Sequence, residues 1–180
     1  MARPPRDLDP GTFHVTSHSV RDTELFRDDL DRTQFLNELA AVTARVGWTC
    51  IEYCQMTTHY HLLVDVDAGV LPIAMHKLNF RYACGFNAKH GTRGHVLERR
   101  YDAGRIMSEA HLLHAFRYIA RNPVAARMVA APQEWPWCSY AATVGLAEPC
   151  SFVNASRVLE FFGPTPEIAI AMLRDFVEKP

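Results

Sequence analysis

Two histidines stand two positions apart in the stretch "THYHLLVDVD", residues 58–67. Residues two apart in a β-strand point to the same face, so His59 and His61 share one side at a spacing of roughly 7 Å along the chain. Two imidazoles placed in this way can bind one divalent cation and leave coordination positions for a carboxamide, water or phosphate oxygens. The alternative is a pair of half-buried histidines that hydrogen bonds satisfy without a metal.

A tyrosine in the stretch "HLLHAFRYIARNP", residues 111–123, is the second group that could do chemistry. Tyr118 lies outside the apolar stripe of the expected helix and is aligned with His114 and Asn122, four residues to either side. A phenol can attack phosphorus when a metal polarises the phosphate, so that the transfer proceeds through a phosphotyrosine. Asn122, expected to end the helix before Pro123, could offer its carboxamide oxygen to the same ion. The alternative for Tyr118 is a partly exposed packing residue.

The elements that must position these residues follow from the spacing of apolar side chains. Alternation predicts strands over residues 12–20, 48–56 and 60–67, with a short strand around 105–107. Helical spacing predicts helices from the acids at 28–31 to Gly47, over 72–88, and over 109–121 with Ser108 as its cap. This order predicts an α+β, ferredoxin-like (RRM-like) βαββαβ fold with an antiparallel sheet and an added third helix.

The predicted sheet gives each strand residue a face. The two crossover helices lie on one side of a ferredoxin-like sheet, and the alternate residues Tyr60, Leu62 and Val64 can pack under them. The two histidines then occupy the other face, which the third helix is available to cover. We expect residues 1–147 to form the catalytic domain and residues 148–180 a small helical extension packed on it, with short helices near 154–162 and 166–177.

Composition narrows the class of protein. The chain has 180 residues, 48% of them apolar and 22% charged, with no apolar run long enough to span a membrane. The start "MARPPRDLDP" lacks the apolar core of a signal peptide or anchor, so we predict a cytoplasmic protein that does not bind membranes. Its five cysteines contain no CxxC pair, which argues against a disulfide framework and a zinc ribbon.

Charge is unevenly distributed along the chain. Residues 77–127 contain ten Lys and Arg against three acids, a balance of +7, whereas the whole chain has a net charge of −1, which leaves −8 elsewhere. This asymmetry predicts one positive face that attracts a polyanion, and the alternative is a set of loop arginines on a solvated surface.

Four segments in order resemble the single-tyrosine HUH transposases of the IS200-like superfamily, in particular the REP-associated tyrosine transposase branch. They are "MTTHYHLLV", "LNFRYACGFNAKHGTRGHV", "FRYIARNPVAARMV" and "EWPWCSY", and the resemblance covers about residues 13–145. HxH alone is weak support, whereas HxH followed by RYxxxNPV and then WPWxSY is specific.

The resemblance implies a function and a set of site residues. His59, His61 and Asn122 would bind Mg²⁺ or Mn²⁺, and Tyr118 would cleave and rejoin single-stranded hairpin DNA, such as REP-like or insertion-sequence ends, through a 5′-phosphotyrosine. The protein would act as a monomer or a homodimer. The candidates for DNA contact are Lys89, Arg93, Arg99, Arg100, Arg105 and Arg121. Trp135 and Trp137 are expected either to stack on bases or to pack against the core.

Two departures from the family pattern bear on specificity. The usual Met-Pro-Asn before the histidines is Met56-Thr57-Thr58 here, which changes the turn but removes no ligand. The usual Gln-Gly after the glycine-histidine pair is Glu98-Arg99, which affects the expected sequence preference. Two further functions stay open: a non-catalytic, domesticated nucleic-acid-binding regulator of the same fold, and a metal nuclease in which water replaces the phenol.

Overall fold

The computed structural model describes residues 9–98 and 100–179, so Arg99 lies outside the described residues. Its sheet contains β1 (Gly11–His18), β2 (Trp48–Gln55), β3 (His59–Val66) and β4 (Asp102–Arg105), in the spatial order β2-β3-β1-β4. All three neighbouring pairs are antiparallel. Together with the two crossover helices, this is the α+β, ferredoxin-like fold that the sequence predicts.

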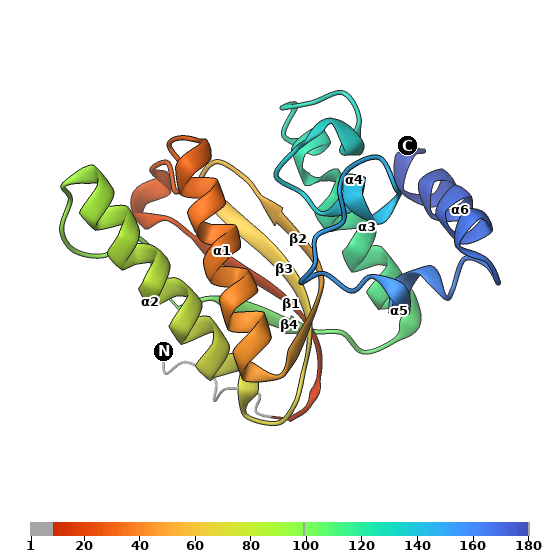
Figure 1. The fold of residues 1–180 in the computed structure, drawn as a ribbon, viewed down its shortest axis with the longest axis horizontal. Coiled ribbons are helices and arrows are strands. Elements are labelled where there is room, and N and C mark those ends of the chain that lie inside the picture. The colour runs from red at the N-terminus through yellow and green to blue at the C-terminus, as the bar shows by residue number, and fades with distance from the viewer. Residues whose placement is uncertain (1–8, 99, 180) are drawn as a thin grey trace.

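The crossover helices α1 (Asp29–Val46) and α2 (Val70–His90) lie side by side on one face of the sheet (Figure 1). The Asp28 side chain caps α1 by accepting from the Asp31 backbone amide, and Gly47 ends it in a left-handed conformation at φ 71°. The first core lies between these helices and the sheet, and Tyr60, Leu62 and Val64 belong to it. Burial of these alternate residues fixes the face of every other side chain on β3.

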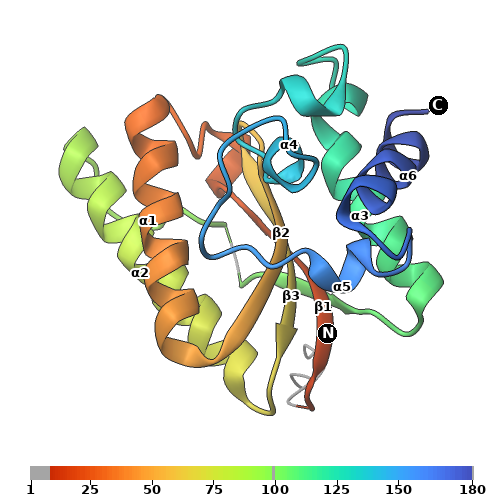
Figure 2. The same ribbon diagram turned by 45° about the vertical axis from the view of Figure 1, so that its right-hand side comes forward.

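Helix α3 (Glu109–Ala125) covers the opposite face (Figure 2). The Ser108 hydroxyl caps it by accepting from the His111 amide at 3.2 Å. Leu112, Phe116 and Ile119 point from α3 into a second core, which also contains Leu63 from β3. The sheet is therefore buried on both sides, and α3 is held directly above the central strands.

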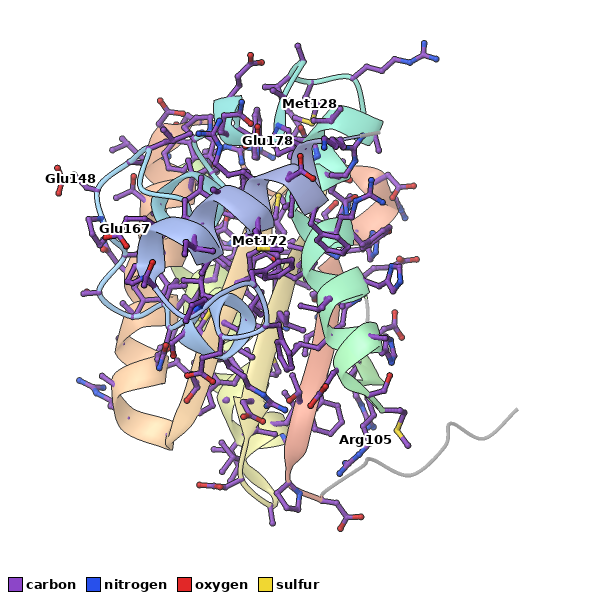
Figure 3. All side chains as sticks on the ribbon, turned by 90° about the vertical axis from the view of Figure 1, so that its right-hand side faces the viewer. Arg105, Met128, Glu148, Glu167, Met172 and Glu178 are labelled. Carbon is purple, nitrogen blue, oxygen red and sulfur yellow. The ribbon has the colours of Figure 1, made fainter. Side chains whose placement is uncertain are left out.

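The C-terminal segment completes the second layer. It contains η2 (Pro132–Glu134), α4 (Tyr140–Thr143), α5 (Ser156–Leu159) and α6 (Pro166–Glu178), while the short η1 (Val20–Asp22) follows β1. Val158, Leu173 and Val177 are fully buried in the second core. In Figure 3, which faces this layer, α6 lies in front of the sheet and carries Met172 and Glu178.

The outer edge of β2 is covered by the chain itself. The Gln55 amide donates to the Trp137 carbonyl at 2.9 Å, and the Ser139 amide donates to the Tyr53 carbonyl at 3.0 Å. Further along, the Asn154 amide donates to the Cys50 carbonyl at 2.7 Å. Residues 137–139 and 153–154 thus satisfy backbone groups that an edge strand otherwise exposes.

Helix α3 and strand β4 differ from the prediction for physical reasons. Helix α3 does not end before Pro123 but continues to Ala125, because proline removes only its own N–H and the next turn still closes through the Ala126 amide and the Asn122 carbonyl at 2.9 Å. Strand β4 occupies 102–105 rather than 105–107, because it pairs with Phe13 to Thr16 of β1. Asp102 and Gly104 have low strand propensity, so the local sequence does not indicate a strand there.

All five cysteines are free thiols, and Cys50, Cys54 and Cys138 are buried. Across the part of the chain that the structure describes, no helix has the length and apolar character needed to cross a bilayer.

Candidate active site

His59 and His61 lie on the face of β3 that α3 covers, opposite to the first core. Their ring centroids are 5.0 Å apart and the rings are nearly perpendicular, at 86°. That separation suits two imidazoles bound to one cation at about 2.1 Å per nitrogen. The strand thus supplies two ligands at a spacing that one ion can bridge.

One nitrogen of each ring has a hydrogen-bond partner. Nδ1 of His59 lies 3.2 Å from the Thr58 hydroxyl, and Nδ1 of His61 lies 3.0 Å from Nε2 of His14. Nε2 of His61 is buried and has no hydrogen-bond partner among the described residues. A buried nitrogen without a partner is costly unless a ligand uses it, so the residues present fit a bound cation.

The electrostatics favour neutral rings. Burial lowers the pKa of His59 to about 4, assisted by His18 and opposed by Asp22. Burial also lowers the pKa of His61 to about 2, with further lowering from His14, His59 and His18. Both imidazoles are consequently unprotonated near pH 7 and present a lone pair, the form in which histidine binds metals.

Strand β1 adds two histidines that the motif search on the sequence missed. His18 pairs with His59 in the antiparallel register, and their rings stack at 4.7 Å with an interplanar angle of 16°. Thr16 pairs with His61, and His14, two residues before Thr16, contacts His61 through its side chain. The signal was the alternation His14, Thr16, His18 in "FHVTSH", which places these three residues on one face. The contact of the Thr58 hydroxyl with His59 was also missed.

Helix α3 brings Tyr118 to these histidines. The phenol ring centroid lies 5.8 Å from the His61 ring and 5.7 Å from the His14 ring, both in edge-on geometry. Tyr118 remains 56% exposed, so its hydroxyl is accessible to a large substrate. The nucleophile candidate therefore lies beside His61 and His14 of the same chain.

Asn122 is one turn beyond Tyr118 on α3. Its carboxamide nitrogen donates to the Tyr118 carbonyl at 3.1 Å. Among the described residues, no three His, Cys, Asp or Glu side chains are grouped so that they could hold an ion by themselves. A third ligand from a carboxamide such as Asn122 stays a prediction.

Three of the basic residues proposed to contact DNA are engaged within the protein. Lys89 lies 2.8 Å from Asp31, and Arg121 donates to the Val177 carbonyl at 2.8 Å. Arg105 donates to the Pro10 carbonyl at 2.5 Å and lies over the Phe13 ring, on the first-core face of the sheet. Figure 3 shows Arg105 at the opposite end of the molecule from Met128. DNA contact by these three residues stays a prediction.

The other three candidates differ in position. Arg93 and Arg100 are exposed in the segment between α2 and β4, and Arg99 lies outside the described residues. Arg93 and Arg100 therefore remain available to a polyanion on the surface.

Trp135 and Trp137 pack around a buried arginine. The guanidinium carbon of Arg32 is 5.2 Å from the Trp135 ring and 5.5 Å from the Trp137 ring. The Trp135 indole donates to the Gln55 carbonyl at 2.8 Å. These contacts support the packing interpretation, because they join "EWPWCSY" to α1 and to the end of β2, just before the histidine strand.

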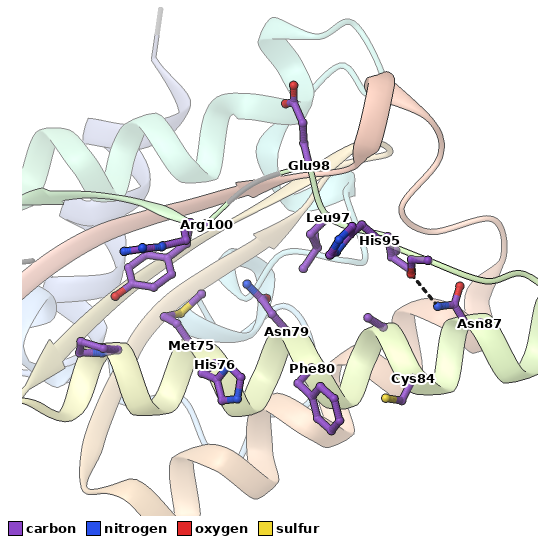
Figure 4. A pocket seen from close by; sticks show the side chains of 15 residues that line it. Met75, His76, Asn79, Phe80, Cys84, Asn87, His95, Leu97, Glu98 and Arg100 are labelled. Atoms are coloured by element: carbon purple, nitrogen blue, oxygen red, sulfur yellow. Dashed lines mark hydrogen bonds between the residues drawn. The ribbon is translucent and has the colours of Figure 1, made fainter. Parts of the chain in front are cut away.

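A cavity of about 760 Å³ lies in the other layer, between α2 and residues 94–98 and 100–101 (Figure 4). Met75, Asn79 and Leu97 line it, and Phe80 lies at its lower rim. Residues of its wall are hydrogen-bonded to strand β1, since the Glu98 amide donates to the His18 carbonyl at 3.0 Å.

No protein-family model matches the sequence, and no curated protein matches it. Among solved structures, the chain is similar to a REP-associated tyrosine transposase bound to a REP hairpin, with a TM-score of 0.67, 17% identity, and coverage of 86% of this chain and 98% of that one. The two proteins share a fold. A putative transposase from Deinococcus radiodurans R1 is also similar, with a TM-score of 0.47, 15% identity, and coverage of 66% of this chain and 95% of that one.

Proposed function

We propose that this protein is a metal-dependent DNA strand transferase that cleaves and rejoins single-stranded or hairpin DNA through a 5′-phosphotyrosine on Tyr118. The observation that carries the proposal is the contact of the exposed Tyr118 ring with His61, whose Nε2 is buried and without a partner. Simple binding of a nucleic acid needs no such pairing of a nucleophile with two neutral imidazoles. The fold shared with a hairpin-bound transposase supports the same substrate class.

Mg²⁺ or Mn²⁺, when bound by His59 and His61, supplies Lewis acidity at the scissile phosphate. The Tyr118 oxygen loses its proton to solvent and forms a bond to phosphorus, while the bond from phosphorus to the 3′ oxygen breaks and that oxygen takes up a proton. The covalent link conserves the phosphodiester energy, so a 3′-hydroxyl can reverse the step and join strands. Low pKa values at His59 and His61 keep both rings in their ligand form throughout.

The test is a denaturing gel of a labelled hairpin oligonucleotide incubated with Mn²⁺. We expect a covalent protein–DNA adduct with the wild type and none with Tyr118→Phe, because the variant keeps the ring and loses the attacking oxygen. Tyr101→Phe serves as the matched control and should keep the adduct. Cleaved DNA without any adduct would indicate a hydrolytic nuclease instead.

The second candidate is a non-catalytic regulator of the same fold. It is favoured by the 17% identity to the hairpin-bound transposase, because a fold can be kept while the chemistry of its site changes. A regulator would bind the hairpin equally well as wild type, as Tyr118→Phe and in EDTA, and would form no adduct under any of these conditions.

A further inference from the structure

The centre of the candidate active site contains a hydrogen bond between two imidazoles. Nε2 of His14 lies 3.0 Å from Nδ1 of His61, and the ring centroids are 5.2 Å apart. His61 is only 4% exposed, so little water competes for this bond. His14 on β1 is therefore the hydrogen-bond partner of Nδ1 of His61, a proposed metal ligand on β3.

This bond can have two proton arrangements. A neutral imidazole carries one N–H and one lone pair, so exactly one of the two facing nitrogens must donate. If Nδ1 of His61 donates, Nε2 of His61 holds a lone pair. If His14 donates instead, Nε2 of His61 carries a proton into a buried environment where it has no acceptor. Only the first arrangement leaves a nitrogen that can bind a cation.

We propose that His14 is a positioning residue, which accepts a hydrogen bond from the Nδ1–H of His61 and thereby holds His61 in the tautomer and ring orientation that binds the cation beside Tyr118. Its role toward the ion rests on the proposed function, whereas the tautomer of His61 does not. Metal-bound histidines generally donate their second N–H to an acceptor that fixes the ring.

The chemistry of the acceptor suits this site. An imidazole accepts the hydrogen bond without adding a negative charge, whereas a carboxylate at the same place would repel a DNA phosphate approaching Tyr118. The His14 ring also contacts the Tyr118 ring edge-on, at 5.7 Å and 66°. One side chain on β1 is thus in contact with both the proposed ligand and the proposed nucleophile.

Two substitutions separate an acceptor from a space-filling group. His14→Gln keeps an acceptor oxygen at about the reach of Nε2, and His14→Leu keeps bulk without an acceptor. We expect His14→Leu to weaken Mn²⁺ binding to the DNA-free protein by roughly 10-fold or more, and His14→Gln to restore most of the affinity. Free Mn²⁺ is measured by electron paramagnetic resonance, with thermal unfolding as the check on folding. His76→Leu, on α2 in the other layer, should leave the affinity unchanged.

A spectroscopic measurement on the wild type requires no variant to fold. ¹⁵N NMR with labelled histidine should show His61 protonated at Nδ1, with coupling across the hydrogen bond to Nε2 of His14. A proton on Nε2 of His61, or equal Mn²⁺ affinity in wild type and His14→Leu, would overturn the inference. Intact Mn²⁺ binding and this tautomer, found without any DNA adduct, would support the inference and refute the proposed strand transfer.

Discussion

The orientation of His59 and His61 depends on the hydrogen-bond partner of the ring nitrogen Nδ1, which is not the nitrogen proposed to bind the ion. Thr58 contacts His59 from the preceding turn, and His14 contacts His61 from the neighbouring strand. Each partner leaves Nε2 as the remaining nitrogen of its ring. Because His61 is the more deeply buried of the two, loss of its partner should disturb the site more than loss of the Thr58 hydroxyl.

A second buried group, Glu52, also lacks a partner. Its side chain is fully buried, and within residues 9–98 and 100–179 neither carboxyl oxygen has a hydrogen-bond partner. It follows a β-bulge at Cys50 and Glu52 and pairs with Leu63 of the second core. Burial, and to a lesser extent Cys138, raises the pKa of Glu52 well above its usual range. The folded protein therefore holds the Glu52 proton to a higher pH than the unfolded chain does.

This proton makes stability depend on pH. A raised pKa in the folded state means that the contribution of Glu52 is fully present below about pH 4.3 and is lost as pH rises, with a slope of at most about 1.4 kcal/mol per pH unit. Glu52→Gln has a similar shape and cannot ionise. We expect it to be more stable than wild type at pH 8 and similar to it at pH 4, as measured by urea unfolding. The exposed Glu148→Gln should show no such difference, and an equal effect from both variants would contradict the prediction.

At the scale of elements, α1 and α2 are joined by a buried carboxylate. Asp31 is fully buried and lies 2.8 Å from Lys89 and 2.9 Å from His90, while the Arg27 amide donates to it at 2.9 Å. Burial alone raises the pKa of Asp31, but hydrogen bonds from Lys89, His90 and the Arg27 backbone outweigh it and leave the pKa lowered. The ionised form therefore connects the start of α1 to the end of α2.

Removal of that charge tests the connection. We expect Asp31→Asn to lower the free energy of unfolding by about 2–3 kcal/mol, because a buried carboxylate with charged donors is worth more than a neutral amide. Denaturant unfolding at pH 7 measures the loss. Asp29→Asn, exposed in the first turn of the same helix, should cost well under half as much. Equal losses would show that the charge near the helix terminus matters rather than the buried contacts.

The sequence predicts the elements better than it predicts their contacts. Strict alternation and helical spacing predict the four-stranded sheet and its helices, and the HxH pair leads directly to the correct face of β3. The position of β4 is set by pairing with β1, so local propensity misses it. The hydrogen bond between His14 and His61 joins residues 47 positions apart. It depends on the register between β1 and β3, which no local sequence pattern predicts. The contacts of Lys89 with Asp31 and of Arg121 with Val177 also join residues far apart in the sequence, so no local pattern predicts them.

The whole molecule combines a nearly neutral charge with a basic segment. Residues 77–127 carry +7, and Arg93 and Arg100 are exposed on the segment that leads from α2 to β4. That segment is hydrogen-bonded to β1 next to His18, close to the proposed chemistry. A polyanion approaching the site would therefore meet positive charge first.

Salt dependence measures this attraction. We expect hairpin affinity to fall steeply with salt, and Arg93→Ala and Arg100→Ala each to reduce the logarithmic slope by about one. Arg45→Ala, exposed on α1 outside the basic segment, is the matched control and should leave the slope unchanged. Fluorescence anisotropy at several salt concentrations gives all four slopes, and an equal reduction for Arg45→Ala would remove the case for a positive face.

The cover over β2 also determines how the molecule meets copies of itself. A second chain could add a strand at β2 only by displacing residues 137–139 and 153–154, which already hydrogen-bond to the backbone of β2. The opposite border, β4, offers only four residues, too few for a stable strand-to-strand association. The covered edge of β2 and the short strand β4 both discourage lateral growth of the sheet.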